Sequence, residues 1–464
     1  MNPLLIGGLI GVILFVLLGL GLPVAFALGL TALISVALFL TASELGYFST
    51  LVFDSLNSFT LLAIPLFILM GAIFGQSKAS KDLLEAANAW VGKLRGGLAM
   101  SSVVACSIFA ALTGSSPATS AAIGRIAIPE MLRRGYPGGV AAGAIAAGGT
   151  LGILIPPSVT LILYGIATEQ SVGQLFLGGV GPGVMVTVLF SVWIFIAVTL
   201  HRRSRTRELV GAGTPANGDA GTDQSSAKEV LSTAVEISGH TWRNRFGLLV
   251  KVLPFVALMT GILVALYAGI TTPSEAAGLG ALMAIVLVGV LYRSVTVRKL
   301  IDAALETTRT STMILLIVAF SAVLGQIMSF LGVPQELATA IGSLEVNRWL
   351  IFIAMNLLFL VLGFFIPPVA IILITMPVLF PIITQLGFDP IWFGVVMTLN
   401  MEMGLITPPV GLNLYVVQGI APEIPLRDIL RGTVPYVGVL ALGIVLLVLF
   451  PEVVTWLPSQ MFSG

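Results

Sequence analysis

Apolar segments about as long as a bilayer crossing recur along the whole chain, and this pattern leaves few folds open. A transmembrane helix needs about 20 mainly apolar residues. Only 9% of the residues are charged, against roughly 25% in soluble domains. We therefore predict an all-α polytopic membrane protein with about ten spans. The expected spans cover approximately residues 4–20, 24–40, 61–74, 140–166, 181–200, 248–267, 276–292, 313–331, 393–417 and 434–450.

Two further apolar regions, near residues 101–130 and 352–384, carry Gly, Ser or Pro at their centres. Each is too long for one straight span and is interrupted by residues that break helices. We expect each region to form a re-entrant helical hairpin, which enters the membrane and leaves it on the same side.

Basic residues gather in alternate loops and predict the orientation of the chain. Cytoplasmic loops of membrane proteins carry an excess of Lys and Arg. The loops assigned to the cytoplasm hold Lys78, Lys81, Lys93, Arg95, Arg133, Arg134, Arg202, Arg203, Arg205, Arg207, Arg293, Arg298, Lys299, Arg427 and Arg431, whereas Arg348 is the exception among the opposite loops. Both termini are therefore expected on the outer side. The first hairpin then enters from the cytoplasm and the second from outside.

Residues 204–244 form the one stretch with a soluble composition. The Gly, Ser, Thr and Asp bias of its first half is typical of a flexible linker, and the segment has no hydrophobic period that could build a core. We expect a cytoplasmic linker between two membrane units, residues 1–203 and 245–464.

The two units repeat at a constant shift, since Pro129 and Pro381 differ by 381 − 129 = 252. The same shift relates Gly135 to Gly387, Ala118 to Ala370, Gly152 to Gly404, Pro156 to Pro408 and Pro157 to Pro409. Each unit is expected to hold about five spans and one hairpin, and an odd number of crossings inverts the second copy. Inverted repeats with helices broken near mid-membrane are typical of secondary transporters.

The first hairpin tip is rich in hydroxyls, because Thr113, Ser115, Ser116 and Thr119 surround Gly114. A tip frees backbone N–H and C=O groups that cost several kcal/mol each in hydrocarbon unless they are paired. The hydroxyls can pair these groups, or they can bind a small cation together with residues 148–150 of the following break. Both interpretations stay open for any single hydroxyl, and the cluster as a whole favours the cation.

The second tip, residues 363–370, has no polar side chain, so carbonyls freed by Pro367 and Pro368 would have to act as ligands. The break that follows, residues 400–413, is polar and contains Glu402. A carboxylate at such depth costs about 3 kcal/mol on insertion scales and is a functional candidate by default. Glu402 either balances a cation or fixes the broken helix by accepting backbone N–H bonds.

Other function classes lack their signatures. The sequence has no phosphate-binding G-x-x-x-x-G-K-[ST] loop and no catalytic constellation within a span, so an ATP-driven pump and an enzyme are disfavoured. Cys106 lies in an apolar run and His201 and His240 flank the linker, so neither a disulfide framework nor a Cys or His metal centre is expected. The net charge of +1 indicates no nucleic-acid partner.

Arg125, on the returning arm of the first hairpin, is expected to snorkel to the cytoplasmic surface, with contact to a substrate carboxylate as the second interpretation.

Five motifs carry a resemblance that spans nearly the whole chain: "LLAIPLFILMG" (61–71), "TGSSPATSAAIG" (113–124), "GGTLGILIPPS" (148–158), "LGFDPIWFG" (386–394) and "NMEMGLITPPVGLNLYV" (400–416). In these motifs the chain resembles the large membrane subunit of TRAP transporters, the tripartite ATP-independent periplasmic systems. The second tip departs from the family pattern, since it reads "FFIPP" where many relatives have an acidic residue.

The resemblance implies a sodium-coupled importer of organic (carboxylate) anions in the inner membrane of a bacterium or archaeon. It implies two partners, a separate small four-helix membrane subunit and a soluble periplasmic substrate-binding protein. Sodium would be the coupling ion, with no other cofactor. The hairpins and broken helices would move like an elevator against a scaffold. A stand-alone sodium-coupled carboxylate transporter without a soluble receptor is the alternative.

The resemblance also suggests site residues, because the family builds its sodium sites from the hairpin tips and the facing helix breaks. The sodium candidates are Ser115, Ser116, Gly148, Gly149, Thr150, Gly363, Gly404, Thr407 and Gly411. The candidates for binding or supporting the substrate are Thr113, Gly114, Thr119, Pro156, Pro157, Pro367, Pro368, Asn400, Glu402, Pro408, Pro409 and Asn413.

Overall fold

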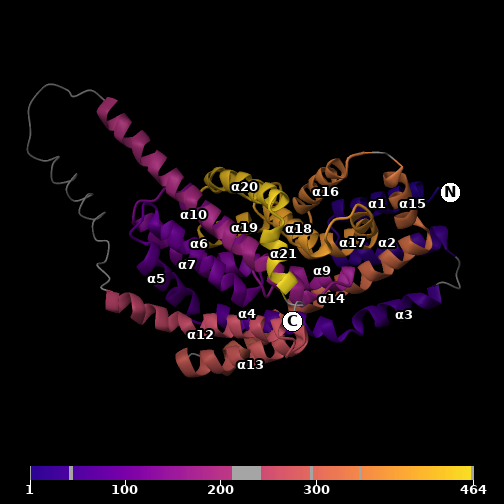
Figure 1. The fold of residues 1–464 in the computed structure, drawn as a ribbon, viewed down its shortest axis with the longest axis horizontal. Coiled ribbons are helices and arrows are strands. Elements are labelled where there is room, and N and C mark those ends of the chain that lie inside the picture. The colour runs from indigo at the N-terminus through magenta and orange to yellow at the C-terminus, as the bar shows by residue number, and fades with distance from the viewer. Residues whose placement is uncertain (1, 41–44, 212–241, 293–295, 344–345, 461–464) are drawn as a thin grey trace, which may run out of the picture.

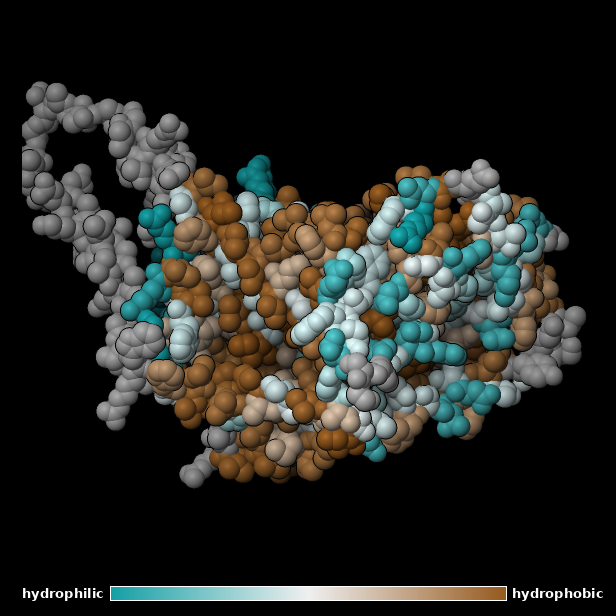
Figure 2. Space-filling view, viewed as in Figure 1, coloured by the Kyte–Doolittle hydropathy of each residue, from teal (hydrophilic) through white to brown (hydrophobic). Residues whose placement is uncertain are grey.

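The computed structural model describes residues 2–40, 45–211, 242–292, 296–343 and 346–460. Within these ranges the fold is all-helical and contains no β-strand (Figure 1). Apolar side chains cover most of the left half of the face drawn in Figure 2, whereas hydrophilic residues are mixed with them on the right half. Several large apolar side chains of the protein are highly exposed, including Val184 at 61%, Val250 at 64% and Val290 at 70%. Such a surface suits a lipid environment better than water.

Two sets of helices make up the chain. The first set is α1 (Pro3–Gly19), α2 (Val24–Phe39), α3 (Leu45–Leu56), η2 (Phe59–Leu62), α4 (Ala63–Gly75), α5 (Ala79–Val91), α6 (Gly97–Thr113), α7 (Ser116–Arg133), α8 (Gly138–Thr150), η3 (Leu151–Ile153), α9 (Val159–Thr168) and α10 (Val172–Gly211). The second set is α12 (Trp242–Tyr267), α13 (Pro273–Tyr292), α14 (Val297–Phe330), α15 (Val333–Gly342), α16 (Arg348–Gly363), α17 (Pro368–Gln385), α18 (Pro390–Leu405), α19 (Leu412–Ile420), α20 (Leu426–Leu449) and α21 (Glu452–Ser459).

The helix bounds repeat at the shift found in the sequence. Adding 252 to the bounds of α7 gives 368–385, which are the bounds of α17. The same addition takes α8 to 390–402 and α9 to 411–420, within a few residues of α18 and α19. It takes α3 and α4 together, 45–75, to 297–327, which α14 covers as one continuous helix. The halves therefore differ there by a bend, which is 58° between the two helices of the first half.

The two halves also pack reciprocally. Helix α7 packs against α19, and the equivalent helix α17 packs against α9. Reciprocal contacts between equivalent elements are what a two-fold axis produces. The structure is therefore an inverted repeat whose halves exchange their hairpins and broken helices across a pseudo-two-fold axis.

Glycine and proline set the ends of the hairpin helices. Gly114 follows α6 with φ +57°, and α7 then begins with Pro117 in its first turn. Gly135 and Gly387 follow α7 and α17 with φ of +74° and +71°. Such positive φ values favour glycine, and proline in a first turn costs no helical hydrogen bond. These local preferences explain why the hairpins could be predicted from the sequence.

The number of spans depends on how the interrupted helices are counted. Six described helices are long and apolar enough to cross a membrane, and a seventh crossing is the bent α3–α4 pair. One of the six is α17, which the sequence assigned to the second hairpin. The predicted total of about ten therefore needs the shorter α1 and α2, together with the broken helices over 140–166 and 393–417. Each of these two broken helices is an interrupted pair, α8 with α9 and α18 with α19.

The expected linker begins later than the sequence suggested. Helix α10 continues to Gly211, so the first eight residues of the predicted linker, 204–211, are helical (211 − 204 + 1 = 8). Residues 212–241 lie outside the described residues, so the flexible linker remains an expectation for that part.

Glycines allow α8 and α20 to meet backbone to backbone. A methyl group placed on Gly143 would overlap the carbonyl of Gly432, and one placed on Gly432 would overlap the carbonyl of Gly139. Small residues at helix contacts let membrane helices approach closely. This contact fixes the first broken helix against the long helix α20.

We expect Gly432→Ala to lower the thermal midpoint of the purified protein, since overpacking costs about 1–3 kcal/mol. The control is Gly438→Ala on the same helix, where an added methyl meets nothing within 4 Å. The measurement is thermal unfolding of both variants in detergent. Equal midpoints for the two variants would contradict the close contact.

Candidate functional site

The first hairpin tip uses two of its hydroxyls to hold its own shape. The Thr113 and Thr119 hydroxyls lie 2.8 Å apart, and the Thr119 hydroxyl donates to the Ser115 carbonyl at 2.8 Å. The Ser115 hydroxyl, by contrast, makes no hydrogen bond within the described part of the chain. Thr113 and Thr119 therefore support the tip, whereas Ser115 presents a free oxygen.

The break between α8 and α9 lies directly under this tip. A methyl group on Gly152 would lie 2.6 Å from the carbonyl carbon of Ser115, and one on Gly114 would lie 2.7 Å from the carbonyl oxygen of Pro157. The peptide bond between Pro156 and Pro157 is cis. The tip and the break are therefore in backbone contact, with no room for a side chain.

Two further sodium candidates, Gly148 and Gly149, lie at the end of α8, where there is no space for a side chain. A methyl group on Gly149 would overlap the Ser120 hydroxyl, and one on Gly148 would lie 3.2 Å from the Cys106 sulfur. These glycines let the end of α8 approach both arms of the hairpin.

The second half repeats this arrangement with fewer polar groups. A methyl group on Gly404 would lie 2.7 Å from Gly363, and the N–H of Val410 donates to the Phe364 carbonyl at 3.2 Å. Pro367 and Pro368 begin α17, Pro408 and Pro409 are joined by a cis peptide bond, and the Thr407 hydroxyl donates to the Met403 carbonyl. Backbone groups thus dominate the contacts of the second tip, and their role as ligands stays a prediction.

One side chain of the second half reaches into the first tip. Gly411, with φ +53°, is the N-cap residue directly before α19 and precedes Asn413 by two residues. The amide nitrogen of Asn413 donates to the Ser116 hydroxyl at 2.7 Å and to the Ala146 carbonyl at 3.0 Å. Both side chains are fully buried. Asn413 therefore connects the first hairpin and α8 to the second broken helix. Its contact with Ser116 joins a substrate candidate to a sodium candidate.

Glu402 lies in α18 with no exposed surface. Its Oε2 accepts a weak hydrogen bond from the Thr150 hydroxyl at 3.5 Å, and its Oε1 has no partner among the described residues. No backbone N–H donates to either oxygen in that part of the chain. The suggestion that Glu402 fixes the broken helix through backbone bonds is therefore wrong.

Asn400, two residues earlier, faces a partner that the sequence analysis missed. Its amide nitrogen donates to the backbone and side-chain oxygens of Asn356 at 2.9 and 2.8 Å. After Arg348 at its start, the hairpin arm α16 is apolar apart from Asn356, and this single polar residue was the signal in the sequence that could have revealed the contact. The pair fixes α16 against α18 rather than lining the tips.

Three helix N-termini meet at the first tip, because α7 begins there, Asn413 brings in the start of α19, and Val159 of α9 lies close to Gly114. An N-terminus carries partial positive charge and free N–H groups. Such a place can hold a carboxylate without a buried Lys or Arg. Arg125, nine residues along α7 from Ser116, is exposed, so it does not lie in this buried site.

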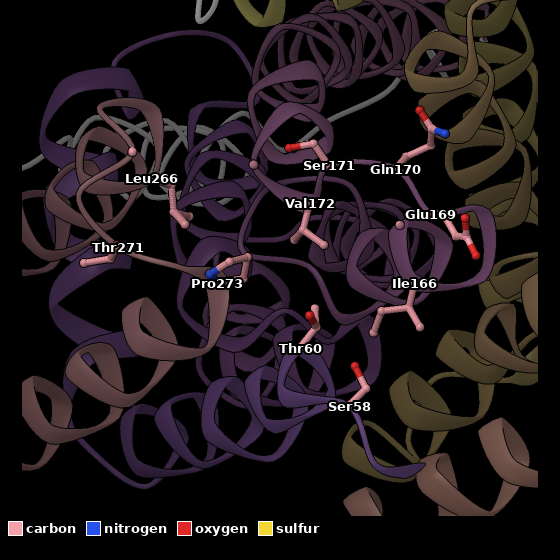
Figure 3. A pocket seen from close by; sticks show the side chains of 13 residues that line it. Ser58, Thr60, Ile166, Glu169, Gln170, Ser171, Val172, Leu266, Thr271 and Pro273 are labelled. Atoms are coloured by element: carbon pink, nitrogen blue, oxygen red, sulfur yellow. The ribbon is translucent and has the colours of Figure 1, made fainter. Parts of the chain in front are cut away.

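A cavity of about 520 Å³ lies elsewhere, where the loops before η2, between α9 and α10, and between α12 and α13 come together (Figure 3). Its lining includes Ser58, Thr60, Glu169, Gln170 and Thr271. None of the residues predicted for the site lines it. Ser116, Thr150 and Asn413 are instead buried in the interior, whereas Ser115 and Thr407 are partly exposed.

Paired hairpins, broken helices and an inverted repeat define this chain as a secondary transporter, a multi-pass membrane protein and not an enzyme. The family model of the tripartite ATP-independent periplasmic transporter, DctM component, matches residues 11–453. The chain therefore belongs to the large permease subunits of the TRAP transporters, as the five sequence motifs indicated.

Several curated relatives agree with this assignment. The C4-dicarboxylate TRAP transporter large permease protein DctM of Pseudomonas aeruginosa is 37% identical over 93% of this chain and 94% of its own length. The protein of the same name from Vibrio cholerae is 35% identical over 96% and 95%. The isethionate TRAP transporter permease protein DctMQ of Oleidesulfovibrio alaskensis is 33% identical over 86% of this chain, which covers 58% of that longer protein.

Solved structures share the fold at low identity. The YdaH transporter of Alcanivorax borkumensis aligns with a TM-score of 0.58 and 18% identity over 99% of both chains. MtrF of Neisseria gonorrhoeae aligns with a TM-score of 0.57 and 14% identity over 88% of this chain and 84% of its own.

We expect Ser116→Ala and Asn413→Ala to be coupled, since each removes one partner of a buried hydrogen bond. A double-mutant cycle on thermal stability should give a coupling of about 0.5–3 kcal/mol. The control pair is Asn413→Ala with Asn356→Ala, whose side chains bond to different partners and whose effects should add. Additivity in the first cycle would refute the Ser116–Asn413 contact.

Proposed function

We propose that this chain is the transport subunit of a sodium-coupled, receptor-dependent importer of organic anions. The observation that carries the proposal is the tip of the first hairpin. Helix N-termini and the free Ser115 hydroxyl converge there inside an apolar protein. This chemistry suits a carboxylate and a small cation bound near each other.

C4-dicarboxylates are the first substrate class to test. Three of the relatives at 33–37% identity are named for C4-dicarboxylate transport. More distant relatives, at 29%, are named for ectoine and for sialic acid. The permease site would then recognise a generic acid group, and the receptor would select among acids.

Sodium coupling would supply the electrical work that the import of an anion requires. An anion that enters against a negative-inside potential is opposed by about 2.3 kcal/mol per charge per 100 mV. Import of more cation charge than anion charge reverses the sign of this work. Ser115 and the carbonyls of the tips and breaks provide the oxygen ligands that hard cations prefer.

The proposal includes two partner proteins and a moving core. The partners are a separate small four-helix membrane subunit and a soluble periplasmic receptor. The hairpins and broken helices would move together, like an elevator, against α1–α4 and α12–α14. The protein would lie in the bacterial inner membrane with both termini in the periplasm. The stand-alone carboxylate transporter remains the second candidate, and it differs in needing no receptor.

The decisive experiment is uptake into proteoliposomes that contain the chain and its small subunit. C4-dicarboxylates and other organic acids are offered with and without the cognate receptor, under an inward sodium gradient or an equal choline gradient. We expect uptake only with both sodium and receptor. Uptake without the receptor would favour the stand-alone alternative, and uptake independent of sodium would refute the coupling.

We expect Ser115→Leu to abolish sodium-dependent uptake while the protein remains folded, because the substitution removes a free oxygen without breaking a hydrogen bond. Ser116→Leu should do the same but also lower stability, since it breaks the bond to Asn413. The control is Ser343→Leu, at an exposed position after α15. An unchanged sodium dependence in Ser115→Leu would remove this serine from the sodium site.

A further inference from the structure

We infer that Glu402 and Thr150 hold one sodium ion where the two broken helices meet, an inference that rests on the proposed sodium coupling. In the sequence analysis, Thr150 is a sodium candidate and Glu402 is among the residues that bind or support the substrate, and it stays open there that Glu402 balances a cation. A carboxylate repels a carboxylate substrate at short range, so the observed surroundings of Glu402 fit a cation better.

The position of the pair in the fold is unusual. Thr150 and Glu402 are equivalent residues of the two repeats, since 402 − 150 = 252, and their side-chain oxygens lie 3.5 Å apart. Equivalent residues contact each other only near the axis that relates the halves. The pair therefore lies on the pseudo-two-fold axis, and both halves contribute to it.

The charge of Glu402 is uncompensated within the described structure. The carboxylate is fully buried, its Oε1 has no partner, and none of the salt bridges of the described residues involves it. Residues 138–168 and 390–420, which form the two broken helices, contain no Lys, Arg or His. An isolated buried charge is costly unless it is paired or coordinates a metal ion. A bound monovalent cation would neutralise it.

The backbone adds negative potential at the same point. Helix α8 ends at Thr150 and α18 ends at Leu405, so two helix C-termini meet beside the Glu402 carboxylate. Each C-terminus carries about half a negative charge. Two half-helix C-termini and one carboxylate form a cation site of the kind found in broken transporter helices.

The local geometry leaves room for a shared ion. The single proton of the Thr150 hydroxyl has a nearer acceptor in the Ala147 carbonyl, at 2.7 Å, than in Glu402 Oε2, at 3.5 Å, so the lone pairs of the hydroxyl are available to a cation. Two oxygens that each lie about 2.4 Å from a hard cation, at right angles, are about 3.4 Å apart. The separation of 3.5 Å between Thr150 Oγ1 and Glu402 Oε2 has this size.

The test measures sodium binding without transport. The full-length protein and its variants are purified in detergent, and thermal unfolding is followed as NaCl replaces choline chloride at constant ionic strength. Sodium that binds only the folded state raises the thermal midpoint in a saturable way. The variants are Glu402→Gln, Glu402→Asp and Thr150→Val, with Glu423→Gln at an exposed position before α20 as the matched control.

We expect Glu402→Gln to weaken the apparent sodium affinity by at least about tenfold, with a smaller loss in Glu402→Asp and Thr150→Val. Glu423→Gln should behave like the wild type. If Glu402→Gln keeps the wild-type sodium response, Glu402 is a neutral buried acid and the inference is refuted. If Glu402→Gln does not fold, a wild-type sodium affinity in Thr150→Val refutes it equally. A wild-type protein with no sodium response would instead count against sodium coupling itself.

Discussion

The structure depends on a backbone contact between each hairpin tip and the broken helix of the same half. Gly152 lies against Ser115 in the first half, and Gly404 lies against Gly363 in the second. In an apolar interior there is no water to pair the peptide groups that a broken helix frees, so irregular backbone must lie against other polar groups. Each tip supplies such polar groups to the break of its half, and each break supplies them to the tip. Hence neither is expected to persist without its partner.

This constraint also organises the charges of the interior. The helix N-termini gather at the first tip, whereas the C-termini of α8 and α18 gather around Glu402. The partial positive charges of the helix N-termini and the partial negative charges of the helix C-termini therefore lie at different places in the interior. The two broken helices carry one charged side chain, Glu402, between them. Polarity in this region comes mainly from how the chain folds rather than from charged residues.

The sequence predicted much of the fold because glycine and proline act locally. The shift of 252 residues identified equivalent breaks, and the helix bounds of α7 and α17 repeat it to the residue. The contacts between distant side chains were harder to predict. Asn413 with Ser116 and Asn400 with Asn356 join elements whose relative placement depends on the packing of whole helices. The Thr150–Glu402 contact is different, since the repeat shift relates the two positions and could have suggested that they meet.

The packing of the first hairpin has a practical consequence. Cys106 is the only cysteine of the chain, and it lies fully buried behind Gly148, where α6 meets the end of α8. A thiol-reactive dye or spin label would therefore find no accessible thiol on the native fold. Cysteines introduced elsewhere would be labelled selectively in the natural background, and distances between hairpin and scaffold could be followed by spectroscopy without first removing the native cysteine.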